Sequence, residues 1–132
     1  MTWLARWLYM VAAIQCSALI AAWMPDAWVD ACAELMGVEP LPHTPLAGYL
    51  ARLSSMMYFV HGATLCIVAK NLPQSEFMIL PLGWVSIFLG FAMLGIDIAE
   101  RMPIFWTGIE FAAIATNGMV MVLFAGIENK PT

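Results

Sequence analysis

Charged residues are scarce in this sequence. Only 11% of its 132 residues are Asp, Glu, Lys or Arg, whereas a soluble domain carries about a quarter. Apolar residues, in contrast, make up 63% of the chain. Because so little polar surface cannot cover a globule in water, we expect lipid to be the solvent of this protein.

Basic residues are the rarer of the two charged kinds. Five Lys and Arg residues stand against nine Asp and Glu residues, so the formal net charge is −4, and no basic stripe runs along the chain. Proteins that bind nucleic acid present a basic patch or stripe to the phosphates. We therefore expect no nucleic-acid partner.

Cysteine is also rare, and its spacing disfavours several kinds of site. Cys16, Cys32 and Cys66 lie too far apart in the sequence for a Cys-x-x-Cys pair, and no H-E-x-x-H motif occurs. We expect no disulfide framework and no metal site. Neither serine nor cysteine lies in a recognisable nucleophile motif, so an enzyme is the class of function least favoured.

Long apolar runs are what the chain does contain. A helix that crosses a bilayer needs roughly 20 mostly apolar residues. Four stretches reach this length: about Trp3–Met24, Leu46–Ala69, Phe77–Ile98 and Pro103–Phe124. We predict an all-α fold, an integral membrane four-helix bundle in which residues 1–132 form a single transmembrane domain.

The longest connection, residues 25–45, contains the pattern of a short helix. Trp28, Leu35 and Met36 recur at helical spacing, and Gly37 is a typical helix stop. We expect this helix to lie along the membrane interface, with Trp28 at the depth of the lipid headgroups. It either caps the bundle, which is the more ordinary role, or offers a docking surface to a partner.

The few basic residues predict an orientation. With four spans both ends of the chain lie on one side, and that side collects Arg6, Lys70 and Lys130. Arg101 lies on the opposite side, together with the acidic connection 25–45. Because an excess of Lys and Arg marks the cytoplasmic face, we expect both termini to be cytoplasmic.

Ionisable side chains nevertheless occur inside the apolar runs. At 1.5 Å per residue, Arg52 and Glu110 lie at similar depths in two parallel helices, and Asp97 ends the helix between them. A lone charge inside a bilayer costs a few kcal/mol on insertion scales. We therefore expect Arg52 to pair with Glu110, with Asp97 or with both.

Other polar side chains lie deeper. His61 and Asn117 fall at similar levels, and Tyr58 precedes His61 by one turn. The candidate polar cluster, for binding or for structure, is thus made up of Arg52, Tyr58, His61, Asp97, Glu110 and Asn117. It either fixes the register of the helices, which is the more ordinary role, or forms a path on which His61 exchanges protons.

Haem is a further candidate, because small four-helix membrane proteins often carry it. His61 is the sole histidine of the four spans, since His43 belongs to the connection 25–45. Ligation by two histidines of one chain is therefore excluded, and methionine is left as the alternative second ligand, although the 11 methionines of the chain give that pairing no specific signal. We expect neither haem nor another cofactor.

Two stretches resemble a group of small bacterial membrane proteins, mostly hypothetical. They are "GYLARLSSMMYFVHGATL" (48–65) and "LGIDIAERMPIFWTGIE" (94–110), and the group shows "YLAR…S..Y..HG" in its second helix and "GID……MP.FWT..E" before its fourth. The resemblance spans roughly Pro25 to Glu110. It implies four helices in a bacterial inner membrane, with Arg52, His61, Asp97 and Glu110 recurring, and it implies no assigned activity.

The role favoured by these features is that of an accessory or structural subunit. Gly83, Ser86 and Gly90 form a stripe of small residues that permits close helix packing, and no reaction motif is present. The partners are then the lipid bilayer and other membrane proteins or further copies of the chain. The alternative is transport of a proton or a small molecule through the polar layer around His61 and Glu110.

Overall fold

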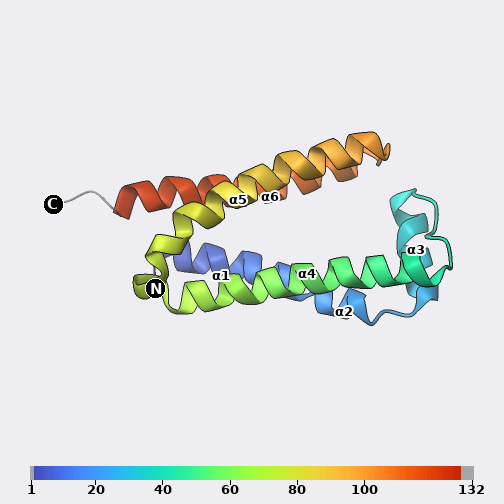
Figure 1. Ribbon diagram of the computed structural model, residues 1–132, viewed down its shortest axis with the longest axis horizontal. Coiled ribbons are helices and arrows are strands. Elements are labelled where there is room, and N and C mark those ends of the chain that lie inside the picture. The colour runs from blue at the N-terminus through green and yellow to red at the C-terminus, as the bar shows by residue number, and fades with distance from the viewer. Residues whose placement is uncertain (1, 129–132) are drawn as a thin grey trace. The chain divides into compact units, whose positions relative to one another are not determined.

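The computed structural model describes residues 2–128, and the regular elements of these residues are all helices (Figure 1). They are α1 (Trp3–Cys16), α2 (Ala18–Ala22), α3 (Asp26–Met36), α4 (Pro45–Lys70), α5 (Leu72–Ala99) and α6 (Ile104–Glu128). The predicted all-α class is thereby confirmed.

Four helical stretches within residues 2–128 are long and apolar enough to cross a membrane. They are Trp3–Ala22, Pro45–Lys70, Gln74–Ala99 and Ile104–Ala125. Each coincides with one of the predicted apolar runs to within a few residues. The helices fall into two compact units, Met1–Ala69 with α1 to α4 and Lys70–Thr132 with α5 and α6.

The first apolar stretch is interrupted once, at Ser17, between α1 and α2. The Ser17 hydroxyl donates a hydrogen bond to the carbonyl oxygen of Ile14 at 2.6 Å. A serine that bonds the preceding turn in this way often bends a helix. The helix predicted over residues 3–24 is therefore divided into two segments, α1 and α2, and the second of them ends at Ala22.

α1 and α4 pack closely in the first unit, where Figure 1 shows them side by side. Leu4, Leu8 and Ala12 form the buried face of α1. On α4, a Cβ atom built on Gly62 would lie 2.9 Å from the backbone nitrogen of Cys16 and 3.0 Å from the carbonyl oxygen of Ala12. Only a glycine lets the two backbones approach this closely.

The connection between the first two spans contains α3, as the sequence predicts. Gly37 ends this helix in the left-handed conformation, with φ of 70°. The amide of Val38 donates to the carbonyl of Ala33 at 3.0 Å, and the amide of Gly37 donates to that of Glu34 at 3.0 Å. These bonds form a Schellman motif, in which the glycine satisfies the last helical carbonyls.

The second unit is a pair of antiparallel helices held together by small residues. A Cβ atom on Gly118 of α6 would lie only 2.6 Å from the carbonyl oxygen of Gly83 on α5, and one on Gly90 would lie 3.3 Å from the nitrogen of Ala115. The aromatic rings of Phe91 and Phe111 meet edge to face at 5.2 Å. The stripe of small residues predicted around Gly83 and Gly90 therefore lies on the face of α5 that packs against α6.

Two backbone features shape the second unit. Pro81 lies inside α5 and has no amide hydrogen to donate, which bends a helix, and Figure 1 shows α5 bent in its first half. The turn to α6 contains Arg101 in the left-handed region, with φ of 56°. The amide of Met102 donates to the Asp97 carbonyl at 2.9 Å, so this turn repeats the Schellman arrangement without a glycine.

Candidate functional site

Arg52 joins three elements of the first unit. It lies on α4, and its Nη1 donates a hydrogen bond to the carbonyl oxygen of Ala22, the last residue of α2, at 2.9 Å. Its Nη2 forms an ion pair with Oδ1 of Asp26, the first residue of α3, at 3.1 Å. Since the last carbonyls of a helix have no partner within the helix, Arg52 acts as a cap for α2 as well as a counter-charge for Asp26.

The acid that Arg52 bonds differs from the acids that the sequence suggested. Within the first unit its partner is Asp26, because the short turn after α2 returns the chain toward α4 and brings the first residue of α3 beside the guanidinium; Glu110 and Asp97 belong to the second unit. A comparison of depths along separate spans does not reveal such a turn. The side chains of Arg52 and Asp26 are 43% and 68% exposed, so the ion pair alone stabilises the fold by about 0–1 kcal/mol in water.

His61 has its partner on α1. Its Nδ1 lies 2.5 Å from Oε1 of Gln15. The amide oxygen only accepts, so Nδ1 carries the hydrogen, and Nε2 of the neutral ring is left as an acceptor. Sequence reasoning placed Asn117 at the level of His61 and missed Gln15, although Gln15 is the strongly polar residue in the middle of the first apolar run.

Tyr58, the third candidate of the first unit, also lies on α4. Its side chain is one turn from His61, and the residue is 38% exposed. A further polar contact of this unit joins Nε2 of His43 to Oδ2 of Asp30 at 3.2 Å, and so fastens the chain after α3 to α3 itself. Trp28 of α3 is 63% exposed, so its ring does not belong to the packed interior.

The second unit contains the other three candidates. Glu110 accepts a hydrogen bond from Nε1 of Trp106, one turn earlier on α6, at 3.0 Å. Asp97 on α5 and Asn117 on α6 are each only 4% exposed. Asp97 is unusual because its Oδ2 atom is buried and has no hydrogen-bond partner among residues 2–128. Buried carboxylate oxygens are normally satisfied, so this atom calls for an explanation.

The predicted six-residue cluster is therefore divided between the two units. The helix α4 holds Arg52, Tyr58 and His61, while α5 and α6 hold Asp97, Glu110 and Asn117. Arg52 and His61 each bond a residue outside the predicted set. The bonds of Arg52 and His61 share one property, which is that each joins α4 to another helix. Such bonds fix how the helices are arranged.

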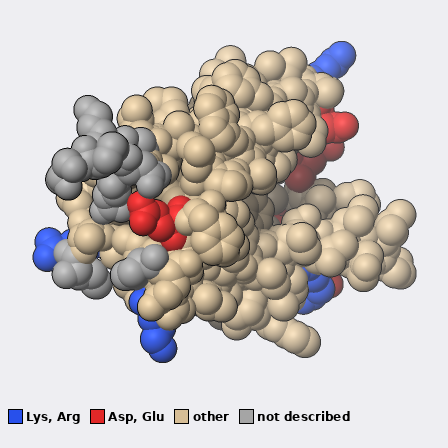
Figure 2. Space-filling model, turned by 60° about the vertical axis from the view of Figure 1, so that its left-hand side comes forward, with Lys and Arg blue, Asp and Glu red and all other residues tan. Residues whose placement is uncertain are grey.

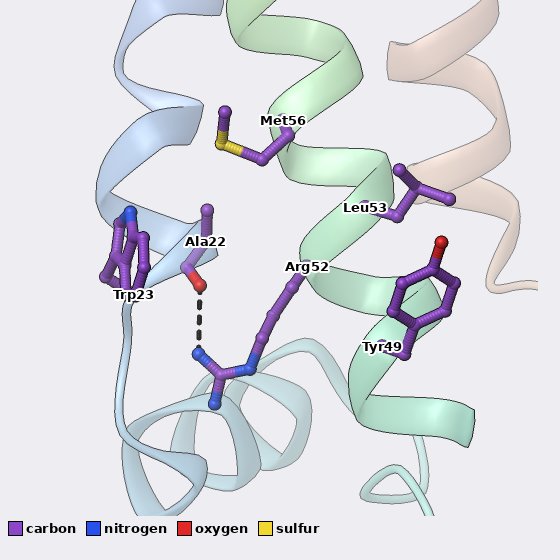
Figure 3. A pocket seen from close by; sticks show the side chains of 6 residues that line it. All are labelled: Ala22, Trp23, Tyr49, Arg52, Leu53 and Met56. Atoms are coloured by element: carbon purple, nitrogen blue, oxygen red, sulfur yellow. Dashed lines mark hydrogen bonds between the residues drawn. The ribbon is translucent and has the colours of Figure 1, made fainter. Parts of the chain in front are cut away.

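A groove opens beside Arg52, between the end of α2 and the first turns of α4. Its volume is about 270 Å³, and it is lined by Ala22, Trp23, Tyr49, Arg52, Leu53 and Met56. Figure 3 shows the guanidinium reaching from α4 to the Ala22 carbonyl, with Trp23 beside that carbonyl and Met56 deeper along α4. The wall of the groove is thus almost wholly apolar, with two aromatic residues, and Arg52 is its one charged lining residue.

Metal-binding groups are not assembled in the part of the chain that the structure describes. Among residues 2–128, no three His, Cys, Asp or Glu side chains lie close enough together to hold a metal ion. Cys16, Cys32 and Cys66 are free thiols.

Comparison of the sequence with protein-family models gave no match, and neither a curated protein nor a solved structure matches it.

Proposed function

We propose that this chain is a multi-pass membrane protein whose role is structural: an accessory subunit that packs against other membrane proteins or against copies of itself. We place it in a bacterial inner membrane with both termini in the cytoplasm. The single observation that carries the proposal is that the interhelical bonds of Arg52 and His61 are made within one unit, while the outer faces of the spans are apolar.

The apolar outer faces support a location in lipid. Large side chains stand exposed along the spans, among them Ile14 at 66%, Ile67 at 62% and Phe88 at 76%. On the face shown in Figure 2, uncharged surface predominates and charged side chains are few. A water-soluble monomer rarely exposes apolar patches of this extent, whereas lipid or a partner helix covers them without cost.

The exposed side chains of α3 support an interfacial helix. Trp28 is 63% exposed and Leu35 is 89% exposed, whereas Ala33 is buried. An aromatic ring with a polar edge is favoured at the boundary between lipid and water. In this proposal α3 lies in that boundary and Trp28 reaches the headgroups, so α3 limits how deeply the first two spans sit in the bilayer.

The experiment is purification in a mild detergent from the native membrane, followed by mass measurement of the intact complex. A role as accessory subunit predicts a defined assembly well above the 14.5 kDa of the single chain, with a fixed set of partners or a fixed number of copies. A chain that remains a monomer in detergent, and that forms no cross-linked product in the intact membrane, would contradict the proposal.

A second candidate function is a pathway for a proton or a small molecule. The observation that favours it is Oδ2 of Asp97, which is buried in an apolar span and has no hydrogen-bond partner in the described part of the chain. Ionisable groups kept inside a membrane often mark such pathways. Reconstitution in liposomes with a pH-sensitive dye inside tests it: proton flux that the Asp97→Asn variant abolishes favours a pathway, and no flux above empty liposomes excludes one for protons.

A further inference from the structure

We propose that the groove between α2 and α4 binds the headgroup of a phospholipid, and that the preferred headgroup is zwitterionic, with both a phosphate and an ammonium group. The proposal rests on the membrane location given under Proposed function. It commits to a lipid of the surrounding bilayer as the occupant.

The position of the groove in the fold fits the depth of headgroups. The candidate span Trp3–Ala22 ends at the groove, and the span Pro45–Lys70 begins one turn before Tyr49. Trp23 is 81% exposed and Tyr49 is 61% exposed. Exposed tryptophan and tyrosine side chains at the ends of spans characterise the interface, where a polar headgroup meets the first carbon atoms of the chains.

Arg52 supplies a donor for the phosphate. Its side chain lines the groove and is 43% exposed overall, so a lipid can reach it. The bonds to Ala22 and Asp26 engage one N–H on each terminal nitrogen, and a guanidinium carries more donors than these. Because the planar array of donors matches the oxygens of a phosphate, arginine is the side chain of choice for this ligand.

The neighbouring charges decide in favour of a zwitterionic headgroup. Oδ1 of Asp26 lies 3.1 Å from Nη2 of Arg52, and the Asp26 side chain is 68% exposed. A phosphate without a counter-charge would meet this carboxylate beside the guanidinium. An ammonium group on the same lipid compensates for that repulsion, since it can sit against Asp26 while the phosphate meets Arg52.

The apolar lining of the groove can contact the part of the lipid that lies below the headgroup. Leu53 and Met56 follow Arg52 along α4 and line the groove toward the middle of the span, as Figure 3 shows. With about 270 Å³, the groove is smaller than the roughly 300–1,000 Å³ of pockets that enclose whole small molecules. It therefore suits a headgroup, while the acyl chains would run along the exposed apolar faces of α2 and α4.

The test is native mass spectrometry of the full chain in a mild detergent, with equal amounts of phosphatidylethanolamine and phosphatidylglycerol added. The wild type should retain phosphatidylethanolamine in preference. Arg52→Gln removes the charge-assisted bonds to the phosphate and should retain it roughly tenfold less well. The matched control is Arg6→Gln, which removes the same charge from an exposed side chain at the other end of the first span and should retain lipid like the wild type.

Two further variants separate the groove from the fold. Met56→Trp fills the groove but leaves Arg52 and Asp26 in place, so it should lose the lipid even if Arg52→Gln fails to fold. Asp26→Asn removes the site of the ammonium group and should move the preference toward phosphatidylglycerol. Equal retention by Met56→Trp and Arg6→Gln, or an unchanged preference in a folded Asp26→Asn variant, would overturn the proposal.

Failure of this inference can be told apart from failure of the proposed function. A wild-type chain that resists extraction from membranes at alkaline pH but retains no lipid at the groove would refute the groove alone. A chain that alkaline extraction releases would refute the membrane location and with it the groove.

Discussion

Nδ1 of His61 lies 2.5 Å from Oε1 of Gln15, so a polar bond joins α4 to α1 inside two apolar spans. Gly62, the next residue, brings the two backbones to the distance at which this bond forms. Polar side chains that bond across helices fix the rotation of one helix against the other, because any other rotation leaves them unsatisfied in an apolar environment.

Removal of one member of this pair should destabilise the chain. We expect Gln15→Leu or His61→Leu to cost about 1–3 kcal/mol of unfolding free energy, since the remaining polar group is left without its partner. The double variant should lose less than the sum of the single losses. Thermal unfolding in mild detergent measures the wild type, the two single variants and the double variant, which together form a double-mutant cycle. Strictly additive losses would show that the bond contributes nothing.

The close approach of α5 and α6 should be sensitive to one methyl group. A Cβ atom on Gly118 would lie 2.6 Å from a carbonyl oxygen of α5, so we expect Gly118→Ala to cost about 1–3 kcal/mol. Gly108 on the same helix has nothing within 4 Å of a Cβ atom, and Gly108→Ala should be neutral or should stabilise the helix by about 0.5–1 kcal/mol. Equal effects of the two substitutions on the unfolding temperature would contradict the packing described for α5 and α6.

The two bonds of Arg52 should contribute unequally. Asp26→Asn breaks an ion pair whose members are largely exposed, and we expect a loss of about 0–1 kcal/mol. Arg52→Leu also removes the cap of the α2 carbonyl and should cost about 1 kcal/mol more. Chemical denaturation in detergent distinguishes the two, and a larger loss for Asp26→Asn than for Arg52→Leu would reverse this assignment.

Asp97 should behave unlike other buried residues. Because its Oδ2 is buried without a partner, loss of the charge by Asp97→Asn should raise the unfolding free energy by about 1 kcal/mol. The control is Glu100→Gln, an exposed acid at the end of the same helix, which should stay within about 0.5 kcal/mol of the wild type. A clear loss of stability in Asp97→Asn would contradict the description of this carboxylate as buried without a partner.

The orientation can be tested with the native thiol of the connection between the first two spans. Cys32 is exposed, so a chain in which Cys16 and Cys66 are replaced by Ala should react with a membrane-impermeant thiol reagent in intact cells. An Asn71→Cys variant of a chain without its native cysteines reports the opposite side, and should react only after lysis. The reverse pattern would place the termini outside the cytoplasm.

The spans could be read from the sequence because hydrophobicity along a helix is a local property. The apolar run near 46–69 became α4 at Pro45–Lys70, and the pattern around Trp28 and Gly37 became α3 with its left-handed end. A stretch of about 20 apolar residues has few stable alternatives to a helix in lipid, since every backbone polar group must find a partner within it.

The sequence by itself thus determined which segments are helical and which side chains would need partners there, among them Arg52 and His61. Which residues serve as those partners was decided only by the tertiary structure. Asp26 reaches Arg52 because a turn redirects the chain, and Gln15 reaches His61 because Gly62 lets α1 and α4 approach. Which residue becomes the partner depends on how the helices are rotated and spaced against each other. Rotation and spacing follow from packing between segments far apart in the sequence, and the positions of polar residues along the sequence do not reveal that packing.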